Sequence, residues 1–62
     1  MKVKELLKIL EEDGWVVSRT RGSHRQLKHP IKTGLVTVAG KPSSDVPKGT
    51  LNAILKQSGL KE

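Results

Sequence analysis

The sequence lacks several features that stabilise or anchor small proteins. It contains no cysteine, phenylalanine or tyrosine, and Trp15 is its one aromatic residue. Without cysteine the chain can form neither a disulfide nor a cysteine-based zinc site. No apolar run approaches the roughly 20 residues of a membrane-spanning helix, and the N-terminal residues do not follow the pattern of a secretory signal. We therefore expect an intracellular, soluble protein of the cytoplasm that has no contact with a membrane.

The chain is also short and poor in apolar residues. Its 62 residues are enough for one small domain, spanning 1–62, and 34% of them are apolar. A domain of this size buries only about 60% of the surface that its unfolded chain exposes. The core must therefore be thin, and stability depends on well-formed secondary structure or on a partner.

Acidic residues are missing from the central part of the chain. Residues 14–44 contain six basic side chains and no aspartate or glutamate, so this segment carries +6, the net charge of the whole protein. Both histidines lie in the same segment. Segregated positive charge of this kind is typical of proteins that bind a polyanion, most often nucleic acid. The alternative interpretation is an ordinary solvated basic face.

Hydrophobic patterning predicts an α+β fold in the order α-β-β-β-α. Apolar residues recur at helical spacing near both ends of the chain, and Gly14 and Gly59 are suited to end the two helices. Segments rich in β-branched or alternating residues predict a three-stranded antiparallel sheet with both helices on one face. The predicted elements are a helix over residues 2–12, strands over 15–20, 24–29 and 35–39, and a helix from Pro47 to the stop at Gly59.

The register of the first hairpin decides which side chains face solvent. A three-residue loop over 21–23 pairs Val17 with Leu27 and so places Trp15, Val17 and Leu27 under the helices. A two-residue loop over 21–22 would pair Leu27 with Val16 and leave Trp15 and Val17 opposite polar side chains. Since a slip of one residue moves every side chain to the other face, the core should select the three-residue loop. The residues then expected on the open face are Val16, Ser18, Thr20, His24, Gln26 and Lys28.

His24 is the residue best suited to acid–base chemistry. It follows a Gly-Ser turn and is flanked by Arg21 and Arg25 on the open face. Imidazole accepts and donates protons near neutral pH, and an RNA substrate would bring its own nucleophile, the 2′-hydroxyl. Arginine can hold the phosphate and stabilise the charge of the transition state. A surface histidine without a catalytic role is the alternative.

The second histidine and the missing carboxylates argue against other mechanisms. His29 lies five positions after His24, which in a regular strand puts the two rings on opposite faces. We therefore interpret His29 as a strand-end residue that covers the core near Trp15. Two-metal nucleases hold their ions with carboxylates, which residues 14–44 lack. We expect no metal and no other cofactor.

From about Leu6 to Leu60 the chain resembles the HicA family of toxins. The residues that carry the resemblance are Gly14-Trp15, Arg19, Gly22-Ser23-His24, Lys48-Gly49-Thr50-Leu51, Ile54-Leu55-Lys56-Gln57 and Gly59-Leu60. The resemblance implies a fold like that of double-stranded-RNA-binding domains and a toxin of a type II toxin–antitoxin system. It also implies metal-independent cleavage of messenger RNA with His24 as the catalytic residue. The implied partner is a HicB-type antitoxin.

The chain departs from the family pattern after the third predicted strand. Many members carry a proline and a histidine there, where this sequence reads Val38-Ala39-Gly40-Lys41-Pro42. Lys41 offers charge but no proton transfer at neutral pH. We expect Arg21, Arg25 and Lys28 to contact phosphates, and the turn residues to present His24. The full set of expected RNA-binding residues is Arg19, Arg21, Gly22, Ser23, Arg25, Lys28 and Lys41.

Two alternative functions share the basic segment. The first is a non-catalytic module that recognises duplex RNA by its shape. Duplex-binding domains of this topology usually cluster lysines at the start of the second helix, where this chain offers chiefly Lys48, and this difference favours the toxin. The second is a basic surface that serves only an acidic protein partner. This interpretation overlaps with the toxin, whose antitoxin we expect to cover His24 and the basic face.

Overall fold

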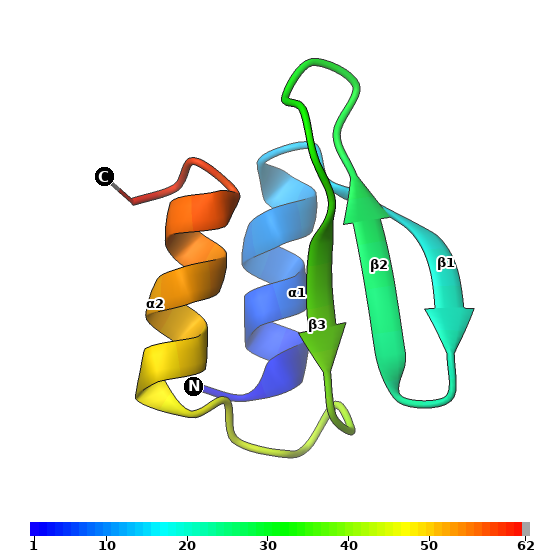
Figure 1. The fold of residues 1–62 in the computed structure, drawn as a ribbon. Coiled ribbons are helices and arrows are strands. Elements are labelled where there is room, and N and C mark those ends of the chain that lie inside the picture. Colours follow the sequence, from blue (N-terminus) through cyan, green and yellow to red (C-terminus); the bar gives the residue numbers. More distant parts are fainter. Residues whose placement is uncertain (62) are drawn as a thin grey trace.

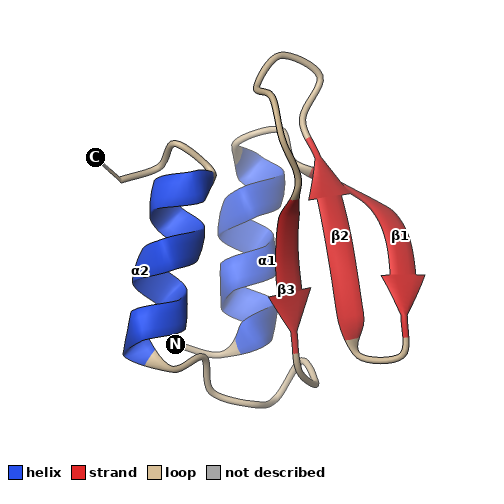
Figure 2. Cartoon of the chain, viewed as in Figure 1, coloured by secondary structure: helices blue, strands red, loops and turns tan. Residues whose placement is uncertain are grey.

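A computed structural model describes residues 1–61 and has the element order that the sequence predicts. The elements are α1 (Val3–Glu12), β1 (Val16–Arg21), β2 (His24–Lys28), β3 (Val36–Ala39) and α2 (Lys48–Gln57). The strands form one antiparallel sheet in the order β1-β2-β3. The two helices run in the same direction beside each other (Figure 1) and pack on one face of the sheet (Figure 2). Within residues 1–61, no helix has the length and apolar character needed to cross a bilayer.

The hydrophobic core lies between the helices and this face of the sheet. Its buried residues are Val3, Leu6, Leu10, Trp15, Leu27, Val36, Val38, Val46 and Ile54. Trp15 and Leu27 are buried as expected, but the prediction that Val17 joins them is wrong, because 38% of Val17 remains exposed. Val17 lies on β1, which is an edge strand and the strand farthest from α2 (Figure 1).

The first hairpin has a shorter turn than expected and compensates with a bulge. Arg21 pairs with His24, so only Gly22 and Ser23 form the loop, and the prediction of a three-residue loop is wrong. Gly22 has φ +58°, as a type II′ turn requires at its first central position. The register then shifts between Val17 and Arg19. This shift restores the predicted pairing of Val17 with Leu27.

The loop between β3 and α2 caps the first helix. The backbone N–H groups of Val3 and Lys4 donate to the carbonyls of Ser44 and Pro42, at 2.9 and 3.1 Å. These are N–H groups that have no partner within the helix. The Lys2 N–H donates to Glu5 Oε1 at 3.0 Å. The loop is therefore anchored to α1 by backbone contacts.

Both helices end in the glycine motif that the sequence predicts. Gly14 and Gly59 have positive φ values, +108° and +77°. The following N–H groups close the motif: Trp15 donates to the Leu10 carbonyl at 3.0 Å, and Leu60 to the Leu55 carbonyl at 2.9 Å. A Cβ on Gly14 would lie 2.8 Å from His29 Nε2, so this position requires glycine for space as well as for conformation.

His29 covers the core at this end of the molecule, as predicted. Its ring meets Trp15 edge to face with centroids 5.3 Å apart. Nδ1 accepts the backbone N–H groups of Ile31 and Lys32 at 3.0 and 3.1 Å, so the proton of the neutral ring lies on Nε2. Nε2 then donates to the Asp13 carbonyl at 2.7 Å. Both ring nitrogens of this histidine therefore have structural partners.

Lys32 joins the C-terminal ends of both helices. Its Nζ donates to Asp13 Oδ2 at 2.6 Å and to the Ser58 carbonyl at 3.0 Å. The ammonium group thus lies where the two helix dipoles are negative. The hydrogen bond from Lys32 is the main reason why the pKa of Asp13 lies below its ordinary value, and the positive charge of Lys32 adds to this effect against the opposing effect of burial.

The lowered pKa of Asp13 predicts a pH-dependent contribution to stability. The ionised carboxylate stabilises the folded state above the ordinary pKa of about 3.9. This contribution disappears as the pH falls through the lower folded-state value. We expect wild type to have a higher Tm than Asp13→Asn at pH 7, and the difference to close between about pH 5 and pH 2. The control is Glu12→Gln, an exposed acid one residue earlier. A difference for Asp13→Asn that does not change with pH would contradict the ion pair.

Candidate functional site

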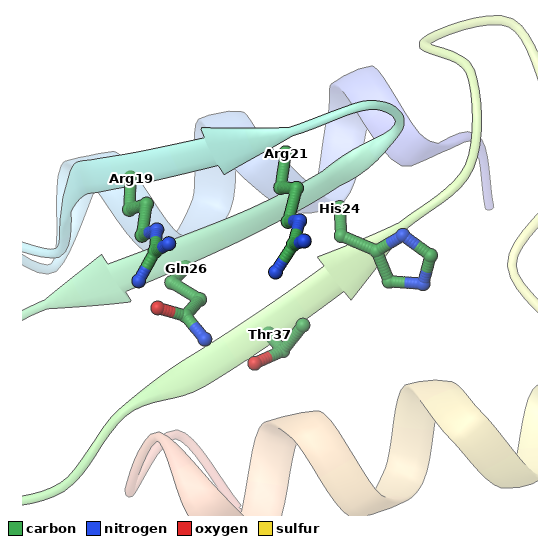
Figure 3. A pocket seen from close by; sticks show the side chains of 5 residues that line it. All are labelled: Arg19, Arg21, His24, Gln26 and Thr37. Carbon is green, nitrogen blue, oxygen red and sulfur yellow. The ribbon is translucent and has the colours of Figure 1, made fainter.

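The open face of the sheet, opposite the helices, carries a hollow of about 250 Å³. We call it the open-face pocket. Its lining residues are Arg19, Arg21, His24, Gln26 and Thr37 (Figure 3). They come from all three strands, and none belongs to the hydrophobic core. The pocket therefore depends on the pairing of the strands.

Strand pairing arranges these side chains in two neighbouring rows. In one row Arg21 pairs with His24, which pairs in turn with the small Ala39 on β3. In the other row Arg19 pairs with Gln26, and Gln26 with Thr37. Side chains that face each other across an antiparallel pair have Cβ atoms about 4.5–5.5 Å apart. A group bound at His24 is thus within reach of both rows.

The bulge at Ser18 places the two arginines on this face. Ser18 has no partner residue in the ladder, and its Oγ donates to the Gln26 carbonyl at 3.2 Å. The extra residue reverses the alternation of β1 between its two ends. Arg19 and Arg21 consequently share the face of His24, where the sequence predicted Ser18 and Thr20. The prediction of the open-face residues of β1 is therefore wrong between the bulge and the turn, where Thr20 lies on the helix side.

His24 is exposed and lies at the first position of β2. Its ring makes no hydrogen bond or ion pair with the described residues, in contrast to the fully bonded His29. The turn before it is held at one point, where the Gly40 N–H donates to the Ser23 carbonyl at 3.1 Å. Both ring nitrogens of His24 are therefore available to a ligand.

Arg25 does not lie in the pocket. It alternates to the helix side of β2, pairs with the buried Val38, and donates through Nη1 to the Gly40 carbonyl at 3.1 Å. The expectation that Arg25 flanks His24 on the open face is wrong. Its guanidinium instead bonds to Gly40, whose N–H donates to the Ser23 carbonyl in the turn.

The remaining expected RNA-binding residues surround the pocket without lining it. Lys28 is exposed on the open face, where it pairs with Val16 at the far end of β2. Gly22 and Ser23 form the turn, and Lys41 is exposed in the loop after β3. The sequence predicts Gln26 on this face without assigning it a function, and it assigns no role to Thr37. The alternation of Thr37 with the apolar Val36 and Val38 was the signal that could have identified it.

The positive charges of residues 14–44 have different surroundings. Lys32 is paired with Asp13, whereas Arg19, Arg21 and Lys28 make no ion pair with any residue from 1 to 61. The same described residues contain no group of three histidine, cysteine or acidic side chains that could hold a metal ion. The open face is thus a positively charged surface around a single free imidazole.

Comparison with known protein families gives one assignment. The family described as the HicA toxin of bacterial toxin–antitoxin systems matches residues 3–60. The matched range includes every helix and strand, the two glycine helix ends and the open-face pocket. A search of individual curated proteins gives no significant match. The chain therefore belongs to the HicA family, as the toxin of a toxin–antitoxin system whose partner is an antitoxin.

Proposed function

We propose that this toxin is a metal-independent endoribonuclease that cleaves messenger RNA in the cytoplasm, with His24 as its catalytic residue. One observation carries the proposal: an imidazole with both nitrogens free lies directly opposite Arg21, in a pocket without any acidic side chain. RNA suits such a site because its phosphates are negative and its 2′-hydroxyl is a built-in nucleophile. No further cofactor is needed for that reaction.

The proposed reaction is a transesterification within the RNA strand. His24 removes the proton of the 2′-hydroxyl, O2′ forms a bond to phosphorus, and the bond from phosphorus to O5′ breaks. The protonated imidazole returns the proton to the leaving O5′, which leaves a 2′,3′-cyclic phosphate and a 5′-hydroxyl end. Arg21 and Arg19 stabilise the negative charge that develops on the phosphate oxygens.

Phosphate binding is assigned to the open face alone. Arg19 and Arg21 line the pocket, and Lys28 extends the positive surface along β2. Arg25 is excluded from this set because its guanidinium is bonded to Gly40 on the other side of the sheet. Gly22 and Ser23 contribute by shaping the turn, and Lys41 by its charge beside it.

The antitoxin is proposed to be of the HicB type and to cover the same face. Its contacting surface would be acidic, since carboxylates beside Arg21 and Lys28 displace phosphates and at the same time close access to His24. Inhibition then requires no conformational change in the toxin.

Loss of the imidazole tests the catalytic assignment. We expect His24→Gln to lower the rate of RNA cleavage in EDTA by about 10²–10⁴-fold. Tm and RNA affinity should stay close to wild type, because the ring is exposed and packs against no core residue. The measurement is cleavage of purified messenger RNA, with a thermal melt of both proteins. Undiminished cleavage would remove His24 from the mechanism, and RNA binding without cleavage by wild type would indicate the duplex-binding module instead.

The salt dependence of RNA affinity tests which face binds phosphate. Each phosphate contact on a single strand contributes about −0.7 to the slope of log K against log salt concentration. Arg21→Met should make this slope shallower by less than about one unit, whereas the matched Arg25→Met should leave it unchanged. Equal slopes for the two variants would mean that Arg21 does not contact phosphate.

Charge reversal tests whether RNA and antitoxin share a surface. Arg21→Glu combined with Lys28→Glu should weaken both ligands, because each is proposed to place negative groups beside these side chains. Affinities for RNA and for the purified antitoxin are measured side by side. A double variant that loses RNA but holds the antitoxin as tightly as wild type would show that the antitoxin binds elsewhere.

A further inference from the structure

We infer that Gln26, with Thr37 and Arg19, forms a subsite that binds one unpaired nucleobase beside the scissile phosphate and prefers the keto bases guanine and uracil. The inference rests on the proposed function, because His24 and Arg21 define where the phosphate lies. It adds a substrate preference that charge and the catalytic histidine alone do not give.

The position of Gln26 places it one step from the reacting phosphate. It lies two residues after His24 on the same face of β2, which is a distance of about 7 Å along a strand. That distance is comparable to the reach from a phosphate to the base of a neighbouring nucleotide. A phosphate held in the row of Arg21 and His24 therefore brings a base against the row of Arg19, Gln26 and Thr37.

Gln26 combines a fixed backbone with an unused amide. Its carbonyl accepts the Ser18 hydroxyl, and its backbone lies in the ladder between Arg19 and Thr37. Its half-buried side chain makes no hydrogen bond with the described residues and points into the pocket (Figure 3). An amide offers one acceptor and two donor hydrogens. Such a group can pair with the Watson–Crick edge of an unpaired base.

The neighbouring arginine decides which bases fit. Guanine and uracil each present a ring N–H beside a keto oxygen, and Gln26 can accept the first and donate to the second. The second lone pair of the keto oxygen then accepts from the Arg19 guanidinium, which is a donor only. Adenine and cytosine would place an amino group against Arg19 and leave both unpaired. Thr37, opposite Gln26, can donate or accept and completes the row.

Hydrogen bonding is the means of discrimination on this face, because stacking on the planes of His24, Arg19 or Arg21 is open to every base. Proteins that bind single strands without sequence preference usually stack bases on aromatic side chains. The one aromatic residue of this chain, Trp15, is 1% exposed and lies on the helix side of the sheet. A preference among bases must therefore come from contacts to the edge of the base.

Cleavage of a randomised RNA library tests the subsite. The cut positions are mapped by sequencing for wild type, Gln26→Met and Thr37→Val. We expect wild type to favour keto over amino bases about tenfold at one nucleotide flanking the cut. Gln26→Met should reduce this preference to below about twofold, and Thr37→Val should reduce it less. The matched control is Thr20→Val, because Thr20 pairs with Arg25 on the opposite face and should leave the preference unchanged.

An unchanged base preference in Gln26→Met, or a wild-type preference for adenine or cytosine, would overturn the inference. A wild-type protein that leaves the library intact would overturn the proposed function. The base preference of the subsite is then tested by a binding measurement. In that measurement the side-chain amide resonance of Gln26 is followed during titration with the four nucleoside 3′-monophosphates. Shifts with the guanosine and uridine nucleotides alone support the subsite, and equal or absent shifts contradict it.

Discussion

The one-residue bulge at Ser18 is the constraint on which the open-face pocket depends. The turn at Gly22-Ser23 requires Arg21 to pair with His24. The pairing of Val17 with Leu27, in contrast, belongs to the register that places Trp15 and Leu27 on the helix side of the sheet. A regular strand cannot satisfy both, because the first pairing continued without a bulge would set Ser18 opposite the buried Leu27. Ser18, the extra residue, separates the two registers. Its hydroxyl donates a hydrogen bond to the Gln26 carbonyl where the ladder is interrupted. One hairpin can thus contribute apolar residues to the core at its open end and arginines to the open face near its turn.

The two histidines and the six arginine and lysine side chains of residues 14–44 are divided between structural and functional roles. His29, Lys32 and Arg25 each bond to backbone carbonyls and hold the ends of helices or loops in place. His24, Arg19 and Arg21 have no such bonds among the described residues and line the open-face pocket. Net charge alone therefore overstates the surface that is available to RNA. The proposed chemistry needs only the unbonded half of the segment.

Much of the fold follows from the sequence because its signals are local. Apolar spacing and two glycines were sufficient to predict the helices and their ends, and the odd spacing from His24 was sufficient to place His29 on the core side of the sheet. The bulge was not predictable in this way, since both registers of the hairpin satisfy part of the hydrophobic pattern. The error left Arg19 out of the residues expected on the open face and put Thr20 among them. The position of Arg25, in contrast, follows from simple alternation along β2.

In the mechanism that we propose, the 2′-hydroxyl of RNA is activated by His24 and attacks the phosphate without a metal ion. The most direct measurement uses a short RNA that is cut at one position, together with the same strand carrying a single 2′-deoxynucleotide there, both in EDTA. We expect 2′,3′-cyclic phosphate ends by mass spectrometry for the RNA and no cut at the deoxy position. Cleavage at the deoxy position, or a 3′-hydroxyl end, would contradict it.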